Sequence, residues 1–251
     1  MHFLTPNSIL FHASNFRVLR LNIYALPFVR ARVCRIRFAT LKRTHGVRQG
    51  NHDEVLHLAY SESHFSSYLS FKGRVNYLVR IVDSLLPANK SNFSVLSIGP
   101  RFESELFGYR GLGLKWRNIK GLDTFSYSPK IEVGNMHSAP FDSESFDIIV
   151  CGWTIAYSAT PEVAFSEFSR LLKPGGKVVI TWDLPDSYQV RDPSALTLSR
   201  KQDIDRIETL LPENRILETI ASGFTVYRLE LGRLNFNRDT PFATLILQPM
   251  K

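Results

Sequence analysis

The sequence predicts one α/β domain built around a mostly parallel sheet. Short apolar runs alternate with amphipathic segments over most of the chain, as strands and helices do in folds of this class. The runs at 95–98 and 146–150 are apolar and rich in β-branched residues, which is typical of strands covered on both faces. Two further strand-like runs, 224–231 and 241–248, flank a turn-rich stretch and indicate a C-terminal antiparallel hairpin.

Length and composition exclude several classes of protein. The 251 residues can form a sizeable core, and 44% hydrophobic with 22% charged residues is ordinary for a globular protein. No apolar run reaches the roughly eighteen residues that a membrane-spanning helix needs. The two cysteines, Cys34 and Cys151, are too few for a disulfide scaffold and have no zinc-ligand spacing, so we expect a reducing compartment and no metal site.

The positive charge is concentrated at the N-terminus. Residues 1–50 hold nine basic residues and no acidic ones, which leaves 22 basic against 23 acidic residues elsewhere. Three interpretations stay open for this segment: contact with an anionic membrane surface, an organelle transit peptide, or an extension that packs on the domain with its charges in water. Nucleic-acid binding is disfavoured because no recognisable module accompanies the charge.

The change of charge at Asn51 suggests a division of the chain into a basic extension, residues 1–50, and a domain, residues 51–251, with N-terminal helices over 51–90 and the core over 91–251. We expect the domain to keep a cooperative melting transition without the extension. We expect the protein to be cytoplasmic, with a peripheral membrane location as the alternative. The oligomeric state is not predictable from these features.

The central feature is a strand, a tight turn and a helix over residues 94–107. The apolar run 95–98 stops at Gly99 and Pro100, and Phe102, Leu106 and Tyr109 then recur at helical spacing. Such a turn brings backbone N–H groups and a helix N-terminus to the carboxyl edge of a parallel sheet, where α/β folds bind ligands.

Further elements follow in order. The run 119–123 ends in Asp123, about twenty residues beyond the turn, where a carboxylate at a strand tip can accept from both hydroxyls of a ribose. Residues 51–92 are expected to be helical, with an apolar stripe over 68–86. Thr160 and Pro161 are expected to cap and begin a helix over 160–172, which 173–176 ends before a strand over 177–182. Two more helices are expected between 200 and 223.

Four of these segments together resemble the class I S-adenosylmethionine-dependent methyltransferases. They are the strand and turn 95–99, Asp123, the block 134–147 and the stretch 171–176 before a strand. The resemblance covers residues 75–250 and is to the branch that contains many small-molecule enzymes. It implies a Rossmann-like fold with seven strands, mostly parallel, and S-adenosyl-L-methionine as cofactor.

The resemblance also implies roles for single residues. Ser97, Gly99 and Pro100 would lie against the methionine part of the cofactor, and Asp123 would bind the ribose. Asn135 and Met136 stand beside the adenine, where Asn135 accepts from the exocyclic amine and Met136 donates its backbone N–H. Cys151, Gly152 and Trp153 would contact cofactor and acceptor. The sequence departs from the family pattern at the turn, which has one glycine, and at Ser97, where the family has an acid. Glu103 or Glu105 is the candidate replacement for that acid at the cofactor's ammonium group.

Methyl transfer to a small-molecule, sugar or lipid-linked acceptor is therefore the expected function, by in-line displacement and without a metal. His137 is the candidate base, because its pKa range suits proton removal and the resemblance places it at the cofactor's edge. Trp153, Tyr157 and Trp182 are candidates for the wall of the acceptor site. The alternative is a non-catalytic protein that keeps the fold as a binding or scaffold module. A nicotinamide-dependent enzyme is disfavoured, since the turn lacks G-x-G-x-x-G.

Overall fold

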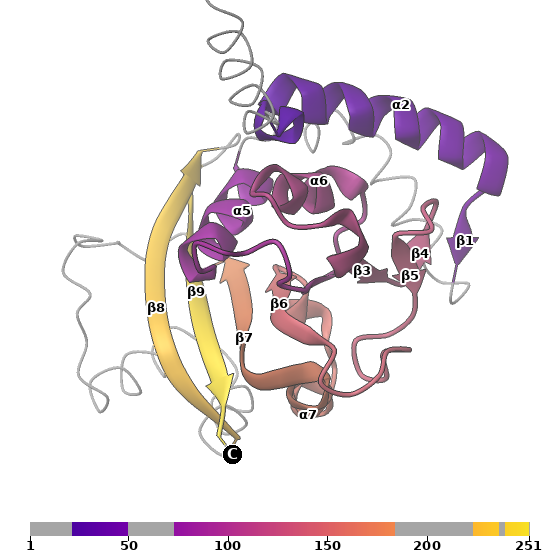
Figure 1. Cartoon of the computed structure of the whole chain (residues 1–251). Helices are drawn as coiled ribbons and strands as arrows, with labels where there is room; N and C mark the ends of the chain where they lie inside the picture. The colour runs from indigo at the N-terminus through magenta and orange to yellow at the C-terminus, as the bar shows by residue number, and fades with distance from the viewer. Residues whose placement is uncertain (1–21, 50–72, 184–222, 236–238, 251) are drawn as a thin grey trace, which may run out of the picture.

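A seven-stranded sheet forms the centre of the molecule (Figure 1). The computed structural model describes residues 22–49, 73–183, 223–235 and 239–250. The strands lie in the order β5-β3-β2-β6-β7-β9-β8. Their bounds are β5 (Ile131–Val133), β3 (Ile119–Asp123), β2 (Val95–Ile98), β6 (Phe146–Gly152), β7 (Leu172–Asp183), β9 (Asp239–Pro249) and β8 (Phe224–Asn235).

The first five strands of this order are parallel, and β9 is antiparallel to both of its neighbours. The predicted mostly parallel seven-stranded sheet with a C-terminal hairpin is confirmed. β2 lies centrally and pairs with β3 on one side and β6 on the other. The turn after β2 therefore stands at the middle of the carboxyl edge, where parallel sheets bind ligands.

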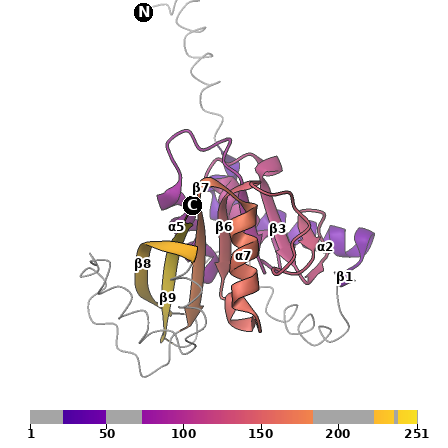
Figure 2. The ribbon, with the colours of Figure 1, turned by 90° about the horizontal axis from the view of Figure 1, so that it is seen from below.

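Helices cover both faces of the sheet (Figure 2). One face packs against α7 (Pro161–Leu171), and the other against α5 (Arg74–Leu85) and α6 (Glu103–Gly111). Successive strand residues alternate between the two cores, as the two-residue period of a strand requires: Ile148 and Val150 face α5 and α6, whereas Ile149 and Cys151 face α7. This double covering explains the continuous apolar runs of the central strands.

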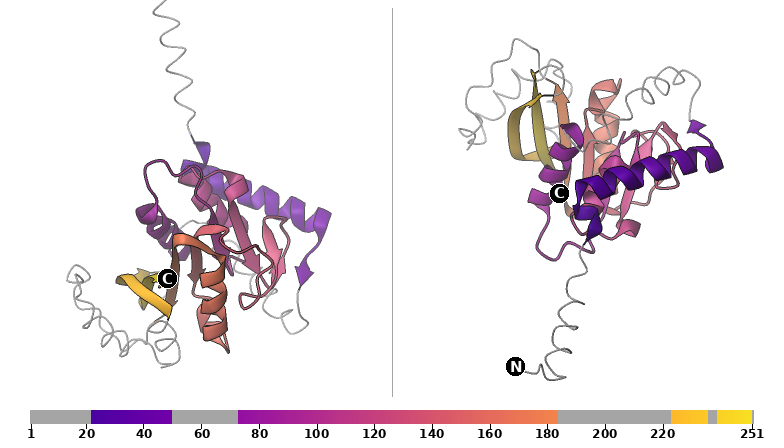
Figure 3. Two further views of the ribbon diagram at one scale, coloured as in Figure 1. Left: turned by 60° about the horizontal axis from the view of Figure 1, so that its bottom comes forward. Right: turned by 90° about the horizontal axis from the view of Figure 1, so that it is seen from above.

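A further helix, α2 (Pro27–His45), lies outside α6 (Figure 3). Its Cys34 is 2% exposed and belongs to the core shared with α5 and α6. After α2 the short strand β1 (Arg48–Gln49) pairs with β4 (Phe125–Ser126) in a separate two-stranded sheet. The described part of the basic segment thus packs on the domain, which fits the third of the interpretations given above. The division of the chain at residue 50 stays a prediction.

Several predicted elements have the expected bounds, and two details are wrong. The strand predicted over 177–182 begins earlier, at Leu172 directly after α7. The pairing between β6 and β7 shifts register between Phe146 and Ile148. The stretch 173–176 is accommodated in this irregular part because Gly175 takes a φ of +79°. Thr160 makes no side-chain capping bond; its carbonyl oxygen accepts from the backbone of Val163 and Ala164 instead.

Part of the prediction lies outside the described residues: the helices expected at 51–72 and between 200 and 222. Among the helices that the structure does describe, none is both long enough and apolar enough to cross a membrane. Three short 3-10 helices, η1 (Ile23–Ala25), η3 (Trp116–Asn118) and η4 (Ile155–Tyr157), complete the described elements.

Candidate cofactor and acceptor site

A cavity of about 360 Å³ opens at the carboxyl edge of β2, β3 and β6. This volume lies in the range of small-molecule sites, about 300–1,000 Å³. Most of the residues predicted for the site line it. They are Gly99, Pro100, Asp123, Asn135, Met136, His137 and Trp153. Three predicted residues do not line it: Ser97, Glu103 and Cys151.

Gly99 is required at the turn by its conformation and by its neighbour. It has a φ of +68°, and its N–H donates to the carbonyl of Leu122 at 2.8 Å, so the turn is fastened to β3. A Cβ at this position would lie 2.3 Å from Oγ1 of Thr154, which itself donates to the carbonyl of Ile98. A side chain here would thus need a strained backbone and a displaced Thr154.

Asp123 ends β3 and is hydrogen-bonded to the turn in the wall of the cavity. One carboxylate oxygen accepts the backbone N–H of Arg101 at 2.8 Å, and the other accepts that of Thr124 at 2.8 Å. Asp123 is 8% exposed, and this burial raises the pKa of its carboxyl to about 6. The backbone N–H groups act in the opposite direction, because they stabilise the ionised form. Arg101, with a φ of 53°, takes the left-handed conformation that directs its N–H at Asp123.

Of the two candidate glutamates, Glu105 lines the cavity and Glu103 does not. Oε1 of Glu105 accepts hydrogen bonds from Ser97 and Tyr109, each at 2.5 Å, so Ser97 contacts a residue of the cavity wall although it does not line the cavity itself. Burial raises the pKa of Glu105, and the hydrogen bonds from Ser97 and Tyr109 lower it in part. Among the described residues no partner binds the second oxygen, Oε2.

Glu103 points away from the cavity and binds the N-terminal helix. Arg37 of α2 donates two parallel hydrogen bonds to its carboxylate, at 2.6 and 2.8 Å, and Ser128 donates a third. The Glu103 side chain has no exposed surface. All of its strong contacts are thus structural, which makes Glu103 a poor candidate for the cofactor's ammonium group.

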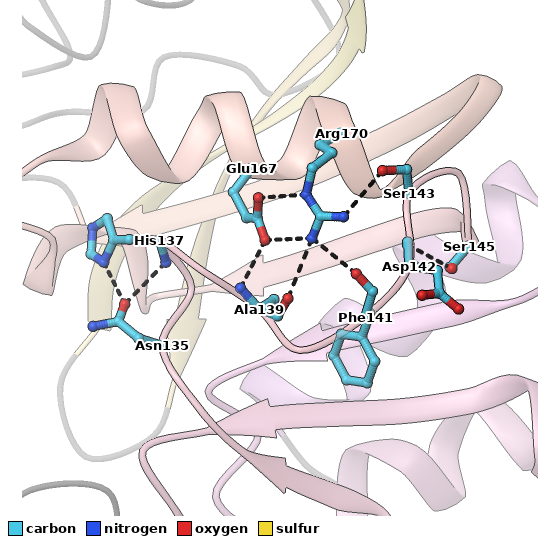
Figure 4. A network of polar contacts seen from close by, with 9 residues as sticks. All are labelled: Asn135, His137, Ala139, Phe141, Asp142, Ser143, Ser145, Glu167 and Arg170. Atoms are coloured by element: carbon cyan, nitrogen blue, oxygen red, sulfur yellow. Dashed lines mark hydrogen bonds and ion pairs between the residues drawn. The ribbon is translucent and has the colours of Figure 1, made fainter.

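His137 and Asn135 form a pair at the opposite wall. Oδ1 of Asn135 accepts the backbone N–H of His137 at 3.0 Å and also contacts its Nδ1 (Figure 4). An amide oxygen can only accept, so Nδ1 carries the ring proton in the neutral histidine and Nε2 is the basic nitrogen. Nε2 lies 2.6 Å from the hydroxyl of Ser158.

The loop behind this pair is fastened to α7 (Figure 4). Glu167 accepts the backbone N–H of Ala139 at 2.7 Å, and Arg170 donates to the carbonyl of Phe141 at 2.9 Å. Glu167 and Arg170 are themselves 2.7 Å apart as an ion pair. The position of His137 is consequently set by a rigid helix as well as by Asn135.

Trp153 forms the third wall, in a conformation that is unusual for a tryptophan. Its φ is 60°, its N–H donates to the carbonyl of Thr181, and its indole Nε1 donates to Asp183 at 2.5 Å. The guanidinium of Arg74 lies 4.5 Å from the ring centroid and binds the same carboxylate of Asp183 at 2.8 Å. Arg74 also lines the cavity, and sequence reasoning missed it, because its partner Asp183 stands 109 positions along the chain.

The other aromatic and sulfur candidates differ in their surroundings. Tyr157 is 74% exposed and lines the cavity, whereas Trp182 is a core residue that does not. Cys151 has no exposed surface, and burial raises the pKa of its thiol to about 12, so it is an unreactive core residue. No cluster of three or more metal-ligating side chains occurs among the residues that the structure describes.

Comparisons with known proteins show that part of this chain is similar in sequence to methyltransferases. Residues 115–180 match the family model described as "Methyltransferase domain", a stretch that contains Asp123, Asn135, His137 and Trp153 and begins after the turn at Gly99. An uncharacterised methyltransferase of Schizosaccharomyces pombe is 36% identical over 55 residues, which cover 22% of this chain and 22% of that protein. The resemblance to the S-adenosylmethionine-dependent methyltransferases is thereby confirmed.

Two solved structures are similar to this chain at low sequence identity. One is the geranyl diphosphate C-methyltransferase from Streptomyces coelicolor A3(2), in complex with Mg²⁺, geranyl diphosphate and S-adenosyl-L-homocysteine. It is 14% identical with a TM-score of 0.48, over 70% of this chain and 79% of that chain. The [4+2]-cyclase SpnF is 15% identical with a TM-score of 0.46, over 68% of this chain and 79% of that chain.

Proposed function

We propose that this protein transfers a methyl group from S-adenosyl-L-methionine to a small-molecule, sugar or lipid-linked acceptor. The observation that carries the proposal is the position of Asp123 at the tip of β3, beside the Gly99 turn in the wall of one cavity. The cofactor supplies a methyl group that its sulfonium already activates. The protein's own residues have to bind the cofactor, align the acceptor and, for an oxygen acceptor, remove a proton.

The donors and acceptors in the cavity suit such a cofactor. An ionised carboxylate offers about four acceptor sites. At Asp123 the N–H of Thr124 and, at 3.4 Å, its hydroxyl donate to Oδ1, whereas Oδ2 accepts the N–H of Arg101. The open site on Oδ2 suits the hydroxyls of a ribose. Glu105 offers its free oxygen to an ammonium group, and a cation arriving there would favour the ionised form that burial disfavours.

The role of Asn135 differs from the one expected. Both acceptor sites of its Oδ1 are directed at His137, so the oxygen is not available to the exocyclic amine of an adenine. Its Nδ2 group is a donor and suits a ring nitrogen instead. We assign the adenine to Asn135 Nδ2 and to the backbone N–H of Met136, which lies beside it in the cavity wall.

His137 is the candidate base. Its Nδ1 proton is held by Asn135, which leaves Nε2 to take a proton from an acceptor hydroxyl once Ser158 turns aside. We expect His137→Gln to lower kcat for an oxygen acceptor by about 10²- to 10⁴-fold, the usual contribution of a general base. Binding of S-adenosyl-L-homocysteine should change less than about threefold, since the proton transfer contributes nothing to product binding.

The control for His137 is Ser158→Ala, which removes the hydroxyl but keeps the imidazole. It should lower kcat far less than His137→Gln does. Equal kcat values for wild type and His137→Gln, measured on an oxygen acceptor, would contradict the assignment of the base.

The function as a whole is tested in two stages. Titration calorimetry of the folded protein with S-adenosyl-L-methionine and S-adenosyl-L-homocysteine should give saturable binding. A cell extract supplied with methyl-labelled cofactor should then yield a labelled acceptor in the presence of the protein. Absence of binding to either compound by the folded wild type would refute the proposal.

The second candidate function is a non-catalytic binding module. It is favoured by the turn itself, where Pro100 removes one backbone donor and Arg101 adds bulk next to Gly99. Binding of the cofactor with no label transferred to any component of the extract would support this module over the enzyme.

A further inference from the structure

The outward face of α2 is both basic and apolar. Phe28 is 70% exposed and Ile36 is 56% exposed, which is unusual for residues of this size. Arg32, Arg35 and Arg43 are exposed on the same helix, which has no Asp or Glu at any position. We refer to these five residues as the α2 outer face.

Helical spacing places these residues together. At 3.6 residues per turn, positions 28, 32, 35, 36 and 43 fall within about 100° of one another around the helix axis, so they share one side of the helix. The other side holds Cys34 and Arg37, which contact the domain. In the right-hand view of Figure 3, α2 lies across the front of the molecule, outside the sheet.

The three arginines of the α2 outer face differ from Arg37, on the inner side, in their ion pairing. Arg37 is fully engaged by Glu103, whereas Arg32, Arg35 and Arg43 form no ion pair with any residue that the structure describes. Their charges are therefore available to an external anion. Two exposed apolar side chains lie among these arginines. A complementary partner therefore needs an apolar layer next to its negative charge.

We infer that the α2 outer face binds the surface of an anionic membrane. Phospholipid headgroups provide a sheet of phosphates for the arginines, and the layer beneath accepts Phe28 and Ile36. A single-stranded RNA would match the charges and could stack on Phe28, but it offers no apolar layer for Ile36. This inference stands independently of methyl transfer, because none of the five residues lines the cavity.

The test uses the full-length protein and sedimentation with vesicles. Vesicles of phosphatidylcholine with one-third phosphatidylglycerol should bind the protein, and pure phosphatidylcholine should bind it much more weakly. Each arginine near the surface contributes about fivefold in affinity, so Arg32→Gln/Arg35→Gln should weaken binding about 25-fold. Phe28→Ser should weaken it roughly tenfold through the lost insertion.

Matched variants control for net charge and for apolar content. Arg80→Gln/Arg117→Gln removes two exposed arginines elsewhere on the domain, and Tyr227→Ser removes an aromatic residue that is 58% exposed. Both should bind like the wild type, and thermal melting should show all variants folded. Equal weakening by the two double arginine variants would overturn the inference. So would wild-type affinity for vesicles in Phe28→Ser, or a preference for single-stranded RNA over the anionic vesicles.

Discussion

Asp123→Asn is expected to weaken the binding of S-adenosyl-L-homocysteine by about a hundredfold or more at pH 8. Hydrogen bonds to a charged group contribute about 1.5–3 kcal/mol each, and two ribose hydroxyls would lose an ionised acceptor together. The amide keeps the shape of the side chain and an oxygen for one of the two backbone N–H groups, and thermal melting checks that the fold persists. Titration calorimetry measures the effect, with Asp142→Asn, an exposed aspartate outside the cavity, as the matched control.

The same carboxylate predicts the pH dependence of binding. Burial raises the pKa of Asp123 to about 6, so the group is ionised above this value and gains a proton below it. A ribose diol needs the ionised form, and affinity should therefore be constant near pH 8 and fall on acidification through pH 6, by up to about tenfold per pH unit. Burial also raises the pKa of Glu105, which lines the same cavity, so Glu105→Gln is measured beside it. A wild-type profile that is flat from pH 5 to 8, or one that Asp123→Asn shares, would contradict this assignment.

Arg37→Met is expected to lower the free energy of unfolding by about 3 kcal/mol, the lower end of the range for breaking a buried ion pair. It would leave the carboxylate of Glu103, which has no exposed surface, with Ser128 as a single strong donor. The lower end applies because the Arg37 side chain is itself one-third exposed. Urea unfolding followed by circular dichroism measures the change.

The double variant Arg37→Met/Glu103→Met tests the cause. Replacing both partners by apolar residues removes the unpaired charge and should recover most of the lost stability. Arg35→Met, two positions earlier on the exposed side of α2, should stay within about 0.5 kcal/mol of the wild type. Double and single variants of equal stability would show that the buried carboxylate is not the source of the loss.

The sequence alone predicted the fold well because each signal was local. The strand ends at Gly99 and Asp123 and the hairpin at the C-terminus follow from apolar runs and turn residues that lie next to one another. The start of β7 was misplaced because Lys173, Pro174 and the two glycines after them look like a break between elements. The pairing of Leu172 with Phe146 is a tertiary contact, and no local signal encodes it.

The candidate site was predicted less completely, for the same reason. The glutamate that lines the cavity could not be chosen between Glu103 and Glu105 from spacing, since the choice depends on Arg37, a residue 66 positions away. Likewise, Ser97 stands where an acid was expected, and only the three-dimensional structure shows that it donates to Glu105. The basic N-terminal segment suggested three roles because the pattern does not reveal which arginines face inward.

The burial of both cysteines has a practical use. Cys34 and Cys151 are the two cysteines of the chain, they are 2% and 0% exposed, and burial raises the pKa of each thiol. Thiol-reactive dyes should therefore leave the native protein largely unlabelled. A cysteine introduced at the exposed Thr40 of α2 or at the exposed Tyr157 of the cavity rim would carry a single fluorophore without further mutagenesis.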